Sequence, residues 1–67
     1  MLDWIDEETL AVGTLDNTLY ILNTVNGTVI SKYTTNSNIK TLKYLTTSGT
    51  LAAFLYNGDI MTLSRDF

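Results

Sequence analysis

Short runs of β-branched, aromatic and aliphatic residues alternate with polar turn residues along the whole chain. Within residues 9–33 these runs predict three short strands, separated by turns at Asp16-Asn17 and at Asn26-Gly27. A short apolar stretch, residues 2–5, precedes them and ends at an acidic tripeptide that suits a loop. The pattern therefore predicts an antiparallel meander of short strands.

Polarity rises from the start of this meander to its end. Residues 10–12 and 19–22 are continuously apolar, which is typical of strands covered on both faces. The stretch 28–33 is more polar, and Val29 and Tyr33 are expected to share one of its faces. Such a gradient is typical of a β-propeller blade, whose inner strands are buried between neighbouring blades.

Gly13 lies inside the second predicted strand. A glycine there permits either the close approach of a bulky side chain or a bulge. Lys32, in the last strand of the meander, fits the placement of a charge on an outer edge.

The second half of the chain repeats the pattern of the first. Residues 2–5 align with residues 42–45 at a spacing of 40, and Thr9-Leu10-Ala11 aligns with Thr50-Leu51-Ala52 at a spacing of 41. Periods of ~40–45 residues with four strands per unit are the signature of propeller repeats. We therefore predict an all-β chain of antiparallel meander blades belonging to an incomplete β-propeller. Residues 1–36 are expected to form a four-stranded first blade, and residues 37–67 a second blade without its outer strand.

The segment L-A-V-G-T-L-D-N-T-L-Y-I-L-N resembles the second strand, turn aspartate and third strand of the WD-repeat family of β-propellers. Asp16 matches the turn aspartate, Thr14 a strand Ser or Thr, and Leu22-Asn23 the Trp-Asp pair, with Leu in place of Trp. The resemblance covers nearly the whole chain as about one and three-quarter repeats. It implies a non-enzymatic scaffold for protein–protein interaction, as a subunit of a complex.

A second resemblance involves N-T-L-Y-I-L-N-T-V-N-G-T-V-I-S-K-Y, which looks like the repeat of quinoprotein-type propellers. Ser31 stands where that repeat carries a Trp. This alternative implies a fragment of a quinoprotein-like enzyme domain. The repeat spacing and the turn at Asp16 favour the WD-type interpretation.

Composition excludes several classes of function. The chain of 67 residues has no His and no Cys, which rules out Ser-His and Cys-His nucleophiles and the common zinc sites within it. Four basic residues are scattered along a chain of net charge −3, so nucleic-acid binding is not expected. No apolar run reaches ~18 residues, so no membrane span is predicted. We expect no catalysis, cofactor or metal, and the lack of Cys favours the cytoplasm or nucleus.

Six residues are assigned to structural turns by their tolerance of left-handed backbone: Asp16, Asn17, Asn26, Gly27, Asn57 and Gly58. Asn26-Gly27-Thr28 is also a glycosylation sequon, but Asn-Gly is the usual chemistry of a two-residue type I′ turn, and the turn role is preferred.

Three residues are candidates for partner contacts. Trp4 aligns with Tyr44, so it is either a core aromatic of an inner strand or an anchor for a partner. Leu15 and Tyr56 occupy equivalent turns, where they contact either a partner or the next blade.

Two blades leave both of their outer faces bare, because propellers close with four to eight. The missing blades are expected from further parts of the same propeller, from other chains, or from copies in a homo-oligomeric ring. The outer strand could be donated by a neighbour. The alternative function is a self-assembling, lectin-like propeller in which Trp4, Tyr44 or Tyr56 stacks on sugars.

Overall fold

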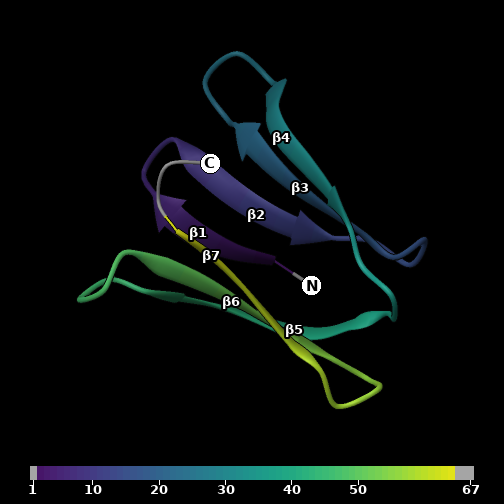
Figure 1. Cartoon of the computed structure of the whole chain (residues 1–67). Coiled ribbons are helices and arrows are strands. Elements are labelled where there is room, and N and C mark those ends of the chain that lie inside the picture. Colours follow the sequence, from purple (N-terminus) through teal and green to yellow (C-terminus); the bar gives the residue numbers. More distant parts are fainter. Residues whose placement is uncertain (1, 65–67) are drawn as a thin grey trace.

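The computed structural model describes residues 2–64, which form seven strands (Figure 1). The first four are β1 (Leu2–Asp6), β2 (Thr9–Gly13), β3 (Thr18–Asn23) and β4 (Thr28–Thr34). The other three are β5 (Ile39–Leu45), β6 (Thr50–Leu55) and β7 (Ile60–Ser64). Among these residues there is no helix, and hence none that could cross a membrane.

The strands pair in chain order, and every pair is antiparallel. Strands β1 to β4 form a four-stranded sheet, here called the first sheet, and β5 to β7 form a three-stranded second sheet. The prediction of an all-β chain of antiparallel meanders is confirmed, and the two sheets are consistent with incomplete propeller blades. Residues 65–67, at the end of the predicted second blade, lie outside the described part.

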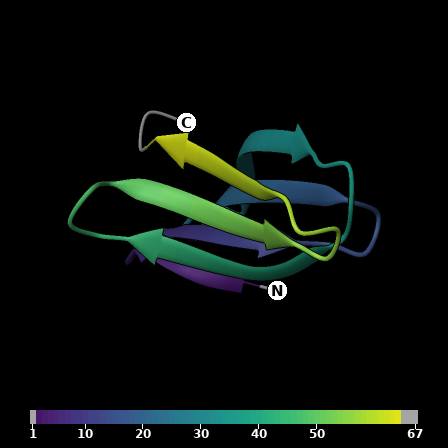
Figure 2. The ribbon, with the colours of Figure 1, turned by 60° about the horizontal axis from the view of Figure 1, so that its bottom comes forward.

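The two sheets lie face to face, with the first strand of each sheet next to the other. Strand β1 contacts β5, and the outermost strands β4 and β7 both lie on the side of the molecule away from β1 (Figure 2). The connection of residues 35–38 joins the sheets. Stacking of successive meanders with their first strands closest is also the arrangement that a propeller requires.

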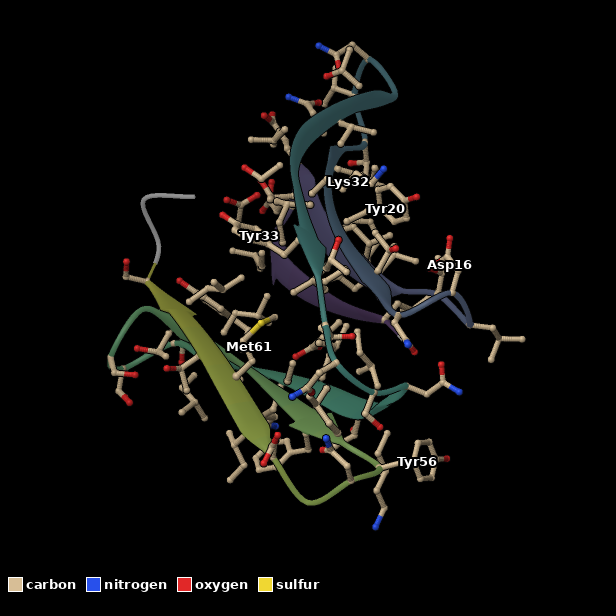
Figure 3. All side chains as sticks on the ribbon, turned by 45° about the vertical axis from the view of Figure 1, so that its right-hand side comes forward. Asp16, Tyr20, Lys32, Tyr33, Tyr56 and Met61 are labelled. Atoms are coloured by element: carbon tan, nitrogen blue, oxygen red, sulfur yellow. The ribbon has the colours of Figure 1, made fainter. Side chains whose placement is uncertain are left out.

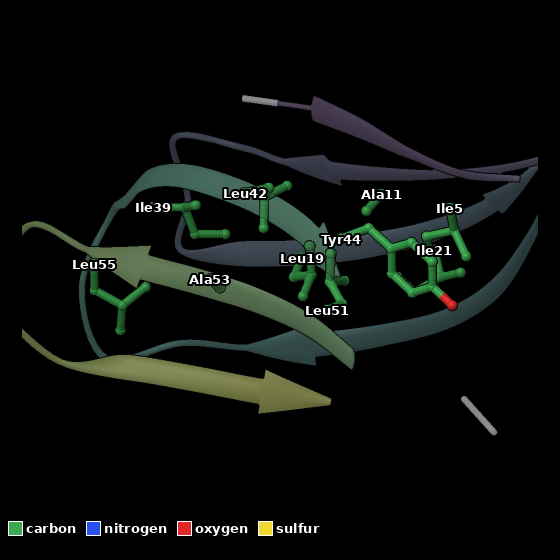
Figure 4. Packing of buried hydrophobic residues seen from close by; sticks show 10 residues of the cluster. All are labelled: Ile5, Ala11, Leu19, Ile21, Ile39, Leu42, Tyr44, Leu51, Ala53 and Leu55. Atoms are coloured by element: carbon green, nitrogen blue, oxygen red, sulfur yellow. The ribbon is translucent and has the colours of Figure 1, made fainter. Parts of the chain in front are cut away.

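The hydrophobic core fills the space between the sheets (Figure 4). The first sheet contributes Ile5, Ala11, Leu19 and Ile21, and the second sheet contributes Ile39, Leu42, Tyr44, Leu51, Ala53 and Leu55. Leu19, Ile21 and Leu51 are fully buried. Because alternate residues of a strand point to opposite faces, these positions follow from the two-residue period of each strand.

Gly13 brings β2 close to the first residue of β5. A Cβ atom at Gly13 would lie 2.8 Å from Cδ1 and 3.2 Å from Cβ of Ile39. The close approach of a bulky side chain, one of the two predicted roles of Gly13, is therefore confirmed. Gly13 pairs regularly with Leu19, so the alternative of a bulge at this position is wrong.

The expectation that Val29 and Tyr33 share one face of β4 is wrong. An extra residue, Ile30, interrupts the pairing, since Ile21 lies opposite Ser31 while Leu22 lies opposite Val29. A bulge of this kind reverses the faces of the residues beyond it, so Val29 and Tyr33 lie on opposite faces.

The turn before β4 is not a two-residue type I′ turn. Residues 24–27 form a four-residue loop in which Gly27 has a φ of 73°, whereas Asn26 is not among the residues of positive φ. The Gly27 N–H donates to the carbonyl oxygen of Asn23 at 2.9 Å, and the Asn23 side chain accepts from Val25 N–H at 2.9 Å. The Asn23 side chain thus stabilises a longer turn than the Asn-Gly pair alone predicts.

Candidate functional site

The face of the first sheet that points away from the second sheet is apolar. Cross-strand partners share a face, so the pairing places Leu2 with Val12, Trp4 with Leu10, and Leu22 with Val29 on this side. We call it the open face, and its apolar members are Leu2, Trp4, Leu10, Val12, Tyr20, Leu22 and Val29. Contiguous exposed apolar patches on a protein surface mark interaction sites.

Trp4 lies on the open face and is 52% exposed. Leu2 and Val29 are also exposed, and Leu10, Val12, Tyr20 and Leu22 are half-buried. The expectation that Trp4 is a core aromatic is therefore wrong for this chain, and residues 10–12 and 19–22 are covered by another sheet on one face only. The partner-contact alternative for Trp4 remains a prediction.

One charged side chain lies on the open face. The Nζ atom of Lys32 lies 5.9 Å from the centroid of the Tyr20 ring, within reach of a cation–π interaction (Figure 3). Lys32 is exposed at this position. This charge sits at the β4 side, whereas Trp4 sits on β1 at the other edge of the sheet.

The internal repeat gives the open face a buried counterpart. At the repeat spacing, Leu2, Trp4, Leu10, Val12, Tyr20 and Leu22 align with Leu42, Tyr44, Leu51, Ala53, Met61 and Leu63. This second set forms the side of the second sheet that packs against the first sheet, with Met61 and Leu63 partly buried. The open face thus has the residue pattern of a surface that, in the other sheet, is covered by a β-sheet.

Asp3 links the first strands of the two sheets. Its Oδ2 accepts a hydrogen bond of 2.7 Å from the backbone N–H of Tyr44, and its Oδ1 accepts one of 3.0 Å from the N–H of Trp4. Trp4 and Tyr44 are the aligned residues of the repeat, so one carboxylate binds equivalent amides of β1 and β5. Charged acceptors make the stronger kind of hydrogen bond, and they also cover strand edges that would otherwise pair with another chain.

The turns β2–β3 and β6–β7 lie on the same rim and have the same geometry (Figure 3). The Thr14 N–H donates to the Thr18 carbonyl at 2.9 Å, and the Leu55 N–H donates to the Asp59 carbonyl at the same distance. Asn17 has a φ of 61° and its aligned residue Gly58 a φ of 93°. Left-handed backbone explains Asn and Gly at these two places.

Leu15 and Tyr56 project from these equivalent turns and are 92% and 69% exposed. Neither packs into the core of the described residues. The segment 35–38 ties both turns together, because Thr35 N–H donates to the Asn17 carbonyl at 2.8 Å and Tyr56 N–H donates to the Asn38 carbonyl at 3.0 Å. The rim is therefore held rigidly while its two apolar side chains remain open to contact.

The turn between β2 and β3 lowers the pKa of the Asp16 carboxyl. The hydroxyl of Thr14 donates to Asp16 Oδ1 and holds the pKa of this carboxyl below its ordinary value. The Thr18 hydroxyl and the charge of Lys32 act in the same direction. Asp16 thus acts as an ionised acceptor within its turn, which is the structural role predicted for it.

A pocket of about 420 Å³ opens between the end of β4 and the start of β7. Its walls come from Thr34, Thr35, Asn36, Leu55, Asp59, Ile60 and Met61. The amide of Asn36 donates to Asp59 Oδ2 at 3.1 Å, and the amide of Asn57 donates to the same oxygen at 3.2 Å. These polar side chains bind one another, so they tie the connection of residues 35–38 to the β6–β7 turn.

Asn26 uses its side chain inside its own turn. Its Oδ1 accepts from the Thr28 N–H at 3.1 Å and from the Thr28 hydroxyl at 2.7 Å. Asn26 and Thr28, the two polar residues of the glycosylation tripeptide, are therefore hydrogen-bonded to each other through their side chains. The turn role of Asn26 has a direct structural basis.

Tyr44 is buried between the sheets, which removes it from the three aromatic residues considered for stacking on sugars. Within residues 2–64 no three carboxylates gather as a metal site would require. No family model and no curated protein matches this chain.

Sequence reasoning missed the link made by Asp3. The signal for it was an acidic residue inside a predicted inner strand, between Leu2 and Trp4. A buried or half-buried carboxylate needs hydrogen-bond donors, and the free amides of a neighbouring strand edge are the donors available there.

Proposed function

We propose that the chain is a non-enzymatic, propeller-type scaffold segment whose open face is covered by another β-sheet in a larger assembly. The observation that carries this proposal is the alignment of the open face with the buried side of the second sheet. A contiguous exposed apolar surface of this kind marks a site where another protein surface binds. The absence of His and Cys from the sequence agrees with an interaction role.

The WD-type repeat remains the family that best accounts for the spacing of the two halves. In that interpretation the first sheet is a complete blade and the second sheet awaits its outer strand. The exposed rim residues Leu15 and Tyr56 would then contact a partner protein at one end of the propeller.

The test is the solution mass of the purified chain by light scattering, with a circular dichroism spectrum of the same sample. We expect a β-rich oligomer, or a chain that folds only when a partner is added, because a two-sheet unit with a bare face is marginally stable. A folded, soluble monomer whose Trp4 fluorescence is freely quenched by acrylamide at all concentrations would contradict the proposal. Trp4 is the only tryptophan, so the fluorescence signal reports on the open face alone.

A further inference from the structure

We infer that the sheet covering the open face is the second sheet of another copy of this chain. The inference rests on the proposed function and names the partner. The contact joins two different surfaces, namely the open face of one copy and the outward face of the second sheet of the next copy. That outward face consists of Thr41, Lys43, Leu45, Thr50, Ala52, Phe54, Ile60, Thr62 and Ser64.

The contact between the two sheets inside the chain provides the template. In that contact the inward side of the second sheet, whose residues align with those of the open face, packs against the inward side of the first sheet. The repeat spacing aligns Ile5, Thr9, Ala11 and Leu19 of that inward side with Leu45, Thr50, Ala52 and Ile60. Each of these four pairs keeps its chemical class, whereas the buried Ile21 aligns with Thr62, and the second set lies on the outward face of the second sheet.

The outward face also has apolar side chains without a cover inside the chain. Leu45 and Ile60 are both exposed on this side of the sheet, among threonines and Lys43. Phe54, the counterpart of Gly13, adds a half-buried aromatic ring to the surface. A second copy would therefore present to the open face an aliphatic and aromatic strip flanked by threonines.

Asp3 and Lys43 are the one aligned pair on these surfaces whose charges are opposite. This exchange matches the different residue that each side chain would face. Inside the chain Asp3 faces β5 and accepts the amide of Tyr44. Between copies Lys43 takes the place of Asp3, and Trp4 takes the place of Tyr44. The amide of Trp4 already has its acceptor in Asp3, so a carboxylate is not needed there. A lysine opposite a tryptophan makes a cation–π contact instead, and Trp is the strongest ring for it.

Contacts between two different surfaces repeat from copy to copy and close into a ring when the rotation permits. Because each copy supplies two sheets, two to four copies give the four to eight blades of a closed propeller. The same arrangement buries the open face of every copy.

The experiment uses the full chain and two variants, each altered on one surface only. Trp4→Glu places a charge on the open face, and Ile60→Glu places one on the outward face of the second sheet. Both side chains are more than half exposed within the chain, and neither belongs to its hydrophobic core. Val25→Glu is the matched control, because Val25 is 72% exposed in the loop before β4 and lies on neither surface. Light scattering gives the mass of each protein alone and of an equimolar mixture of the first two.

We expect the unaltered chain and the Val25→Glu control to form one discrete oligomer. Each single-surface variant should be monomeric, while the mixture should form a one-to-one dimer, because each variant retains the surface that the other needs. If the variants unfold when alone, the mixture should regain β-sheet circular dichroism. Lys43→Gln should weaken the oligomer roughly two- to thirtyfold, which is the range of a cation–π contact.

Four results would overturn the inference. An Ile60→Glu variant that still dimerises would mean that two open faces pair with each other. A mixture that stays monomeric would mean that the two surfaces do not match. A wild-type chain that folds only with a different polypeptide would leave the proposed scaffold function intact but exclude a second copy, whereas a folded wild-type monomer would contradict both.

Discussion

The two sheets arise from aligned halves of the sequence, yet their outward faces differ. The first sheet presents Leu2, Trp4 and Val29 to solvent, whereas the second sheet presents several threonines and Lys43 together with Leu45 and Ile60. Their facing sides, in contrast, share one core. The repeat therefore preserves the residues that pack one sheet against the other. The two outward faces differ because each is adapted to a different neighbouring surface.

The largest difference is expected between two leucines that occupy the same place in the repeat. Leu51 is fully buried between the sheets, and its counterpart Leu10 is half-buried on the open face. Leu51→Ala should lower the free energy of unfolding by about 2–5 kcal/mol, since it leaves a cavity. Leu10→Ala should lower the free energy of unfolding of the isolated chain by about 1 kcal/mol, because the half-buried Leu10 side chain removes less apolar surface from water on folding.

Urea unfolding of both variants at low protein concentration measures this difference. At concentrations where the open face is covered, Leu10→Ala should approach the cost of Leu51→Ala. Equal losses for both variants at every concentration would contradict the distinction between the two faces.

A smaller effect is expected where the sheets approach most closely. Gly13→Ala should destabilise the fold by about 1–3 kcal/mol, since its Cβ would overlap the Ile39 side chain. Adding Ile39→Val removes the Cδ1 atom and should recover part of the loss. Gly27→Ala is the control, because no atom lies within 4 Å of its Cβ and only its φ of 73° opposes the change.

Thermal or urea unfolding of the wild type, Gly13→Ala, Ile39→Val and the variant with both changes gives the coupling between positions 13 and 39. Ile39→Val should not relieve Gly27→Ala. Full additivity of Gly13→Ala and Ile39→Val would show that the sheets do not meet at this point.

The smallest effect concerns pH at the rim. The Thr14 hydroxyl lowers the pKa of Asp16, so the folded chain holds this proton less tightly than the unfolded chain does. Asp16 therefore stabilises the fold above its unfolded pKa, and this contribution is lost as the pH falls through the lower, folded pKa. Thr14→Val should raise the pKa of Asp16 and reduce the loss of stability below about pH 4.

An NMR titration of the Asp16 carboxyl carbon in both proteins measures the shift directly. The same pKa for Asp16 in wild type and Thr14→Val would contradict the assignment of the hydroxyl as its cause.

Much of the fold follows from local chemistry that the sequence carries. Alternating apolar residues specify the strands, and the left-handed positions at Asn17, Gly27 and Gly58 specify the places where the chain turns back. The repeat spacing divides the chain into two meanders. These features depend only on near neighbours along the chain, and for that reason they can be read without the structure.

The tertiary structure decided which apolar face each sheet buries. Residues 19–22 are apolar on both faces, so their sequence does not distinguish Leu19, fully buried, from Tyr20 on the open face. The bulge at Ile30 depends on the register with β3, and the bond from Tyr44 to Asp3 joins residues far apart in the chain. Burial, register and such long-range bonds depend on which sheet lies opposite, and that choice is made only when the chain packs.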